Sequence, residues 1–281
     1  MPKIDSNRPL RFGIVTDVHL STKPEGAAGT NPSAADLGAL IEGFRTKKVD
    51  FVLQLGDLIS GIGNHYLEEL RLALTILKSY PGPIRHVIGN HCLALPREKL
   101  MAELGIKESY YSFSIKGFRF IVLDGMDVSV LREPETAEER KMIEYYHAHP
   151  EIHHYCGAVG ERQKAWLKEV LLRAEQAEEP VIALCHFPLL PETTDEKHGL
   201  LWNHSEIAEL LASSPALKAC ISGHYHYGGH QMQGGTHFVV LPAFVNRHEH
   251  PDFSGGTAEL ECGRIRICNQ HGELFLDLPL N

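Results

Sequence analysis

The chain has 281 residues, of which 43% are hydrophobic and 22% are charged, a composition typical of a globular protein with a large buried core. Its formal net charge of -9, from 27 basic and 36 acidic residues, argues against a protein that binds nucleic acid or an anionic membrane, because both need a basic surface. We expect no signal peptide, because the N-terminal residues include no apolar stretch long enough for one, and no segment approaches the apolar length of a membrane span. We therefore expect a cytoplasmic protein whose six cysteines are reduced.

The first part of the chain alternates short hydrophobic strands with amphipathic helices. The predicted strands are residues 11–16, 50–55 and 84–88, each a short apolar run. Apolar residues at helical spacing predict a helix from Ser33, as its N-cap, to about residue 47, and another with an apolar face over residues 67–77. This alternation is typical of βαβ units and predicts a parallel or mixed sheet with helices on both faces.

The middle of the chain begins with two strand-like runs over residues 110–124, which flank a Lys116-Gly117 turn and predict a β-hairpin. Residues 125–160 are less regular, and we interpret them as an insertion that caps one end of the sheet and contains a helix at about 134–148. An amphipathic helix is then predicted over residues 161–177.

The last part of the chain is predicted to add a strand at 181–185, a helix at 203–213 and a strand at 217–222. Four β-runs follow, and we expect them to form a second, more antiparallel sheet; they are residues 237–242, 257–262, 264–269 and 273–278. No segment has the composition of an interdomain linker, so we expect a single domain over residues 1–281.

Polar side chains follow five of the predicted strands, where ligands gather in α/β sheets. Each cluster alone has an ordinary explanation as a turn, a helix cap or a packed histidine. Those explanations do not account for five such clusters in order, each after a hydrophobic strand. The clusters are Asp17-x-His19, Gly56-Asp57, Gly89-Asn90-His91, His186 and Gly223-His224-x-His226. Their carboxylate, amide and imidazole groups suit divalent Mn, Fe or Zn.

The number of ligands fits two divalent metal ions that share one carboxylate. We expect Asp17, His19, Asp57 and His226 to bind one ion, and Asp57, Asn90, His186 and His224 to bind the other. Two such ions would clamp a phosphate and lower the pKa of a bridging water, whose hydroxide attacks phosphorus. His91 would then protonate the leaving oxygen or stabilise the phosphoryl charge. We expect the glycines before Asp57, Asn90 and His224 to let the backbone turn sharply.

The ordered set D-x-H, G-D, G-N-H, H and G-H-x-H resembles the motifs of the calcineurin-like metallophosphoesterase superfamily, from Asp17 to His226. The resemblance implies a four-layer α/β/β/α sandwich of two mixed sheets flanked by helices, with a two-metal site at the strand ends. It also implies that His91 is the catalytic histidine.

Four further segments look like the manganese-dependent ADP-ribose/CDP-alcohol diphosphatases, which hydrolyse the diphosphate of nucleotide-diphosphate compounds. The segments are DGMDVSV at 124–130, YCGAVGERQ at 155–163, Leu201-Trp202-Asn203 and GHYHYGGH at 223–230. That group often has Gln where this chain has His19, which leaves substrate range and metal preference open.

We therefore predict a dimetal phosphohydrolase, with Mn favoured by the resemblance, that acts on small nucleotide-type molecules such as ADP-ribose or CDP-alcohols. A cyclic-nucleotide or general phosphodiesterase would use the same ligands and is the alternative. A non-catalytic interaction scaffold is a remote alternative, because no predicted ligand is missing. The side chains predicted to contact the base, ribose or distal phosphate are Cys92, Phe187, Trp202, Tyr225 and His198.

Overall fold

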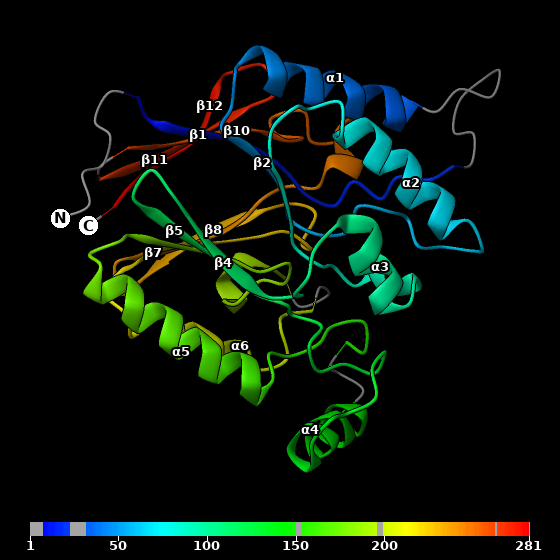
Figure 1. The fold of residues 1–281 in the computed structure, drawn as a ribbon, viewed down its shortest axis with the longest axis vertical. Helices are drawn as coiled ribbons and strands as arrows, with labels where there is room; N and C mark the ends of the chain where they lie inside the picture. Colours follow the sequence, from blue (N-terminus) through cyan, green and yellow to red (C-terminus); the bar gives the residue numbers. More distant parts are fainter. Residues whose placement is uncertain (1–7, 23–31, 150–152, 196–198, 262, 281) are drawn as a thin grey trace.

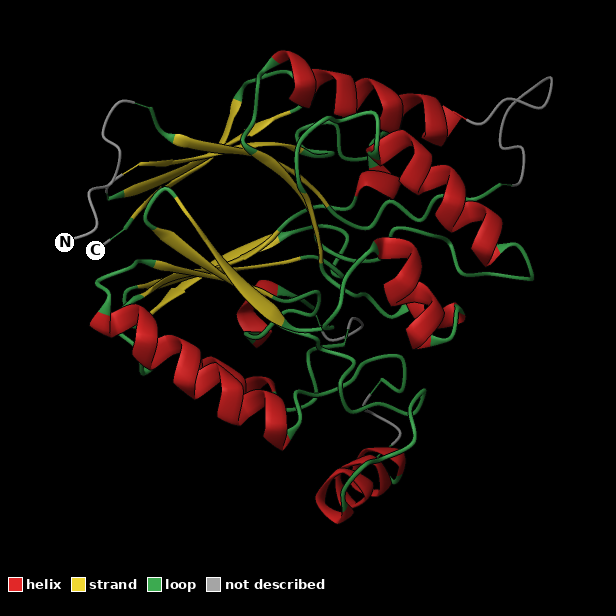
Figure 2. Ribbon diagram, in the orientation of Figure 1, coloured by secondary structure: helices red, strands yellow, loops and turns green. Residues whose placement is uncertain are grey.

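Two β-sheets stacked face to face form the centre of the fold, and helices cover both outer faces (Figures 1 and 2). The computed structural model describes residues 8–22, 32–149, 153–195, 199–261 and 263–280. Within these residues each sheet has six strands. The four layers confirm the α/β/β/α sandwich that the family resemblance implied.

The first sheet has the strand order β12-β11-β10-β1-β2-β3. Its strands are β1 (Leu10–Val15), β2 (Phe51–Gln54), β3 (Ile84–His86), β10 (Gly256–Glu261), β11 (Arg264–Asn269) and β12 (Leu274–Pro279). The strands β1, β2 and β3 are parallel, whereas β10 pairs antiparallel with β1 and places Leu260 opposite Leu10. The prediction that all four C-terminal β-runs belong to a second sheet was therefore wrong for three of them, and only the run at 237–242 lies in the second sheet. The runs that form β10, β11 and β12 extend the first sheet, because this pairing turns Ala258, Leu260 and Ile265 into the same core as β1.

The second sheet has the strand order β4-β5-β6-β7-β9-β8. Its strands are β4 (Tyr111–Ile115), β5 (Phe118–Val122), β6 (Val181–Leu184), β7 (Leu217–Ser222), β8 (Gly229–Gln233) and β9 (Thr236–Val240). The predicted hairpin is confirmed, and its turn residues Lys116 and Gly117 both have positive φ, as in the tight turns that suit hairpins. The edge strand β8 was not predicted, because its residues are mostly polar and exposed.

Helices α1 (Pro32–Thr46) and α2 (Tyr66–Leu77) cover the first sheet, and α5 (Glu161–Gln176) and α6 (His204–Ala212) cover the second (Figure 1). Ser33 lies within α1, so its predicted role as the N-cap was wrong; the helix starts with Pro32, whose fixed φ suits the first turn. The short helix α3 (Arg97–Leu104) was not predicted. Figure 1 shows α4 (Ala137–His147), the predicted helix of the insertion, below the two sheets.

Aromatic side chains fill the space between the sheets. The ring of Phe12 on β1 stacks on Phe51 of β2 at 5.0 Å, and its edge meets Phe120 of β5 at 5.6 Å. Alternate residues of each strand point into this layer, and the residues between them point toward the helices. The two sheets are thereby held at a fixed separation, which also fixes the relative positions of the loops at their strand ends.

In the described part of the chain, no helix combines the length and the apolar character needed to cross a membrane.

Candidate metal centre

The predicted ligands occupy an unusual backbone conformation. Seven non-glycine residues in the described part of the chain have positive φ, and four of them are predicted ligands: Asp17 (50°), His19 (45°), Asp57 (49°) and His224 (67°). Such a conformation costs roughly 1–3 kcal/mol per residue and persists only where the surrounding structure imposes it. The loops after β1, β2 and β7 are therefore held in strained shapes, as is common at functional sites.

The three glycines of the motifs have different roles. Only Gly56 has a positive φ, 108°, as a sharp turn requires. The prediction of the same role for Gly89 and Gly223 was wrong, because close packing excludes a side chain there. A Cβ atom at Gly89 would lie 2.3 Å from Asp57 Oδ1, and one at Gly223 would lie 2.0 Å from Thr16 Oγ1. These two glycines let neighbouring strand ends approach each other.

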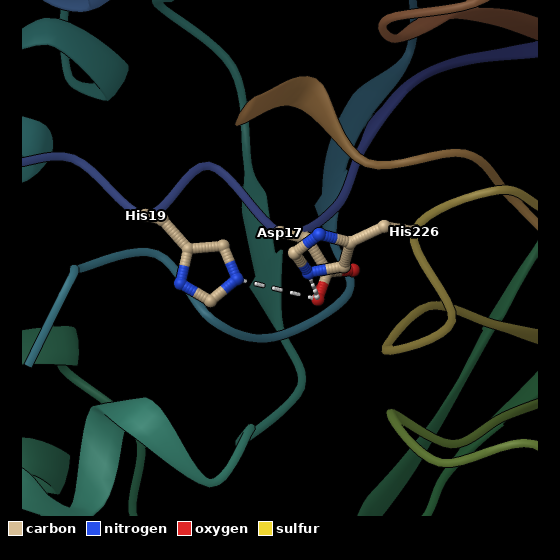
Figure 3. Close-up of side chains that lie close together, drawn as sticks. All are labelled: Asp17, His19 and His226. Atoms are coloured by element: carbon tan, nitrogen blue, oxygen red, sulfur yellow. Dashed lines mark ion pairs between the residues drawn. The ribbon is translucent and has the colours of Figure 1, made fainter. Parts of the chain in front are cut away.

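The carboxylate of Asp17 is anchored through one oxygen and open at the other. Its Oδ2 accepts hydrogen bonds from Thr16 Oγ1 at 2.5 Å and from the His224 backbone N–H at 2.9 Å. Its Oδ1 has no hydrogen-bond partner among the described residues and lies 3.7 Å from His19 Nε2 and 3.6 Å from His226 Nε2 (Figure 3). The three side chains thus direct one oxygen and two nitrogens at a common point.

The carboxylate of Asp57 lies between two sets of imidazoles. Its Oδ1 accepts a hydrogen bond of 2.8 Å from the His91 backbone N–H. Its Oδ2 is 3.2 Å from His186 Nε2 and 3.9 Å from His19 Nε2. A carboxylate in this position is suited to serve two adjacent metal ions.

Three overlapping groups of side chains bring their ligand atoms within 4.8 Å of one another. The groups are Asp17, His19 and His226; Asp57, His186 and His224; and His19, Asp57 and His91. The structure therefore places His224 and His226 in different groups, although a single residue separates them. That each binds a different ion, and that Asn90 is a further ligand, stay predictions.

Several buried polar atoms at this centre lack hydrogen-bond partners within the described chain. They are Asp17 Oδ1, His19 Nε2, Asn90 Oδ1, His186 Nε2 and His224 Nε2. An unsatisfied buried polar group costs about 1–3 kcal/mol, so their concentration in one place needs a cause. A divalent cation would satisfy these oxygen and imidazole nitrogen atoms together, and the donor set suits Mn, Fe or Zn. The residues present thus fit a bound metal.

The charges at the centre are strongly coupled. Burial disfavours the charged form of His186, but the carboxylates of Asp57 and Asp17 outweigh it and raise the pKa of His186 to about 9. Burial and the nearby His186 lower the pKa of His224 to about 3. Burial alone would raise the pKa of Asp17, yet His186 and His19 bring it down to about 2. At neutral pH, His186 in the metal-free protein therefore carries a hydrogen on both ring nitrogens, and binding of a metal ion to this imidazole would displace one of them.

A cavity of about 700 Å³ opens over the centre. Its polar lining is formed by His19, Ser21, Asp57, Ser60, Asn90, His91, His224 and His226. Its apolar lining comes from Ile62, Tyr155 and Val245, which are 64%, 41% and 37% exposed. The sequence analysis missed these three as cavity residues. Tyr155 begins one of the segments that resemble the diphosphatases, which is the one signal that could have indicated it.

The four described side chains among those predicted to contact substrate do not line this cavity. Cys92, Phe187 and Trp202 are buried in the hydrophobic cores, and burial raises the pKa of the Cys92 thiol to about 12. The ring of Tyr225 lies 5.6 Å from that of Tyr227. His198 falls outside the described residues. Cys92, Phe187 and Trp202 therefore pack in the cores and do not line the cavity.

Comparisons with known proteins agree with this geometry. The family model described as calcineurin-like phosphoesterase matches residues 10–228. A manganese-dependent ADP-ribose/CDP-alcohol diphosphatase from Arabidopsis thaliana is 32% identical over 272 residues, covering 85% of this chain and 87% of that protein. The human protein of the same name is 27% identical, covering 88% and 89%. The crystal structure of a dimetal phosphatase from Danio rerio superposes with a TM-score of 0.84 at 24% identity, covering 97% of this chain and all of that one.

Proposed function

Because this chain belongs to the calcineurin-like phosphoesterase family and is thus a metal-dependent phosphoesterase, we propose that it is a two-metal hydrolase that cleaves the diphosphate bond of small nucleotide-diphosphate compounds such as ADP-ribose or CDP-alcohols. One observation carries the proposal: Asp57 Oδ2 approaches His186 from one group of ligand atoms and His19 from the other. The names of the relatives support both the substrate class and manganese.

In this proposal, Asp17, His19, Asp57 and His226 hold one ion, and Asp57, Asn90, His186 and His224 hold the other. The ions, when bound, neutralise phosphate charge and lower the pKa of a water molecule that attacks phosphorus. Thr16 and the His224 backbone N–H orient the Asp17 carboxylate, and the His91 backbone N–H orients Asp57. The protein thereby fixes the donor atoms before a metal or substrate arrives.

His91 acts as the proton donor to the leaving oxygen. Its Nδ1 lies 2.6 Å from the carbonyl oxygen of Ser60, to which it donates a hydrogen bond. This bond leaves Nε2 as the atom that exchanges a proton with the substrate. The bond from its own backbone N–H to Asp57 ties the position of His91 to that of the shared carboxylate.

The cavity supports a nucleotide substrate over a simple phosphate ester. Its volume of about 700 Å³ lies in the range usual for small-molecule sites. Ile62, Tyr155 and Val245 offer an apolar surface for a base, beside the polar centre that takes the diphosphate. Tyr155 belongs to the 125–160 insertion, so we propose that this insertion caps the site and contributes to substrate selection.

The free thiols of the described cysteines suit a cytoplasmic location, which we also propose.

A substrate panel tests the function. The purified protein is assayed with Mn²⁺ against ADP-ribose, CDP-choline, cyclic AMP and bis-p-nitrophenyl phosphate, and then with Mg²⁺, Zn²⁺ and Fe²⁺ in turn. We expect the highest kcat/KM for a nucleotide diphosphate with Mn²⁺. A clear preference for cyclic AMP would instead identify a cyclic-nucleotide phosphodiesterase on the same scaffold. The proposal would be contradicted if none of the compounds were hydrolysed with any of the metals.

A further inference from the structure

The imidazole of His226 is oriented differently from two other imidazoles of the centre. The Nδ1 atoms of His186 and His91 face main-chain oxygens, those of Leu55 at 2.8 Å and Ser60 at 2.6 Å. The Nδ1 of His226 instead lies 2.9 Å from Oδ1 of the Asn246 side chain. Its orientation therefore depends on the identity of a residue that belongs to none of the five motifs.

The orientation of the Asn246 amide is set by Glu249. Asn246 Nδ2 donates a hydrogen bond of 2.9 Å to Glu249 Oε2. Because a carboxylate only accepts, the NH₂ group must face Glu249 and Oδ1 must face His226. Since Oδ1 also only accepts, Nδ1 of His226 must carry the hydrogen. In the neutral imidazole, Nε2 then carries no hydrogen, and it faces Asp17 Oδ1, 3.6 Å away (Figure 3).

Backbone hydrogen bonds connect the segment around Asn246 to His226 and Asp17. Asn246 ends the short 3₁₀ helix η4 (Phe244–Asn246). Just before and within it, the N–H of Ala243 donates to the carbonyl oxygen of His226, and the N–H of Val245 donates to that of Asp17, both at 3.0 Å. The segments that contain Asp17 and His226 thus position Asn246, whose Oδ1 accepts the hydrogen bond from His226.

The side chain of His226 is less restricted by packing than those of His19 and His186. Its side chain is 30% exposed, whereas those of His19 and His186 are 11% and 0% exposed. Packing therefore restricts the His226 ring less, and a hydrogen bond decides more of its orientation.

We propose that Asn246, held by Glu249, is a positioning residue that keeps His226 in the tautomer and orientation in which Nε2 binds a divalent cation beside Asp17. This inference rests on the proposed metal centre. Hydrogen-bond partners of metal-bound histidines typically change metal affinity by 10–100-fold, so the effect is large enough to measure.

Calorimetric titration of the chelator-treated protein with Mn²⁺ alone tests the inference. We expect the native protein to bind two ions. Asn246→Leu keeps the approximate size of the side chain and removes the acceptor, so it should weaken one binding step by about 10–100-fold and leave the other unchanged. Asn246→Asp combined with Glu249→Gln keeps the acceptor for His226 and a hydrogen bond between residues 246 and 249, so affinity should return close to native. Gln231→Leu removes an exposed amide on β8 and serves as the matched control, with native affinity expected at both steps.

A spectroscopic readout separates positioning from a purely structural role. Long-range ¹H–¹⁵N spectra of the metal-free protein should show the hydrogen of His226 on Nδ1 in the native protein and a mixture of tautomers in Asn246→Leu. Native affinity at both steps in Asn246→Leu, an unchanged tautomer, or an equal loss in the double variant Asn246→Asp, Glu249→Gln would each overturn the inference. A native protein that binds no Mn²⁺ would instead overturn the proposed metal centre itself.

Discussion

Asp57 is the carboxylate that approaches imidazoles from both groups of candidate metal ligands. One of its oxygens is occupied by the His91 backbone N–H, and the other faces His186 and His19. No other described carboxylate makes such contacts with both groups, so in the proposed two-metal centre its loss should affect both metal positions at once. At the residue scale, the proposed chemistry therefore separates into binding by Asp57 and proton transfer by His91.

Substitution of His91 distinguishes these roles. His91→Gln should lower kcat on the best nucleotide diphosphate by about 10²–10⁴-fold, the usual contribution of a general acid, and leave Mn²⁺ affinity close to native. Asp57→Asn should reduce both kcat and Mn²⁺ affinity, which calorimetry and steady-state kinetics measure in parallel. A loss of Mn²⁺ binding in His91→Gln would show that His91 is a ligand, as its proximity to His19 and Asp57 permits.

The raised pKa of His186 predicts a pH dependence of stability in the metal-free protein. Its folded-state pKa of about 9 exceeds the ordinary value of 6.5, so its bound proton stabilises the fold fully below pH 6.5. That contribution is lost as pH rises from about 6.5 to about 9. We expect the Tm of the chelator-treated protein to fall over this window.

With saturating Mn²⁺ the metal replaces the proton of His186, so the same fall in Tm should be much smaller. Apparent Mn²⁺ affinity should rise with pH over the same interval. Differential scanning fluorimetry at pH 6, 7.5 and 9, with and without Mn²⁺, measures both effects. A metal-free Tm that rises between pH 6.5 and 9 would contradict the assignment of the proton to His186.

At the scale of elements, the parallel strands that precede the candidate ligands in both sheets end at one edge, and the aromatic layer between the sheets fixes their separation. The site draws on β1, β2 and the loop after β3 from one sheet and on β6 and β7 from the other. A defect in the layer between the sheets should therefore reach the site through the strand ends, even though its side chains contact no ligand.

Phe120→Ala tests the layer between the sheets. This ring is fully buried and packs against Phe12, Phe51 and Phe113. Its removal should lower the free energy of unfolding by about 3–5 kcal/mol, because the transfer free energy is lost and a cavity remains. Urea denaturation measures the change. Leu172→Ala on the exposed side of α5 is the matched control, with little change expected.

At the scale of the whole molecule, metal binding and folding are coupled, because ligands from residues 17 to 226 come together only in the folded chain. Mn²⁺ at about 100 times its dissociation constant should stabilise the native state by about 2.7 kcal/mol per site. Removal of the metal with a chelator should lower Tm, and restored Mn²⁺ should recover it. Asp17→Asn should show a smaller rise in Tm on addition of Mn²⁺ than the native protein does.

Much of the site could be predicted from local sequence, because each ligand follows a short hydrophobic strand and strand ends meet at one edge of a sheet. Asp17, Asp57, His186, His224 and His226 converge as expected. The helices and the 110–124 hairpin follow from periodicity and turn residues, which are also local properties. The sequence alone therefore determined the chemistry of the donor set and most of the elements.

Only the tertiary structure decided how distant segments pair and which side chains remain exposed. The antiparallel pairing of β10 with β1 joins the two ends of the chain, and no local pattern specifies it. Burial of Cys92, Phe187 and Trp202 removed them from the cavity, whereas Ile62, Tyr155 and Val245 line it. The contact of Asn246 with His226 likewise depends on long-range packing. Such contacts are set by the free energy of the whole core, which a single segment does not encode.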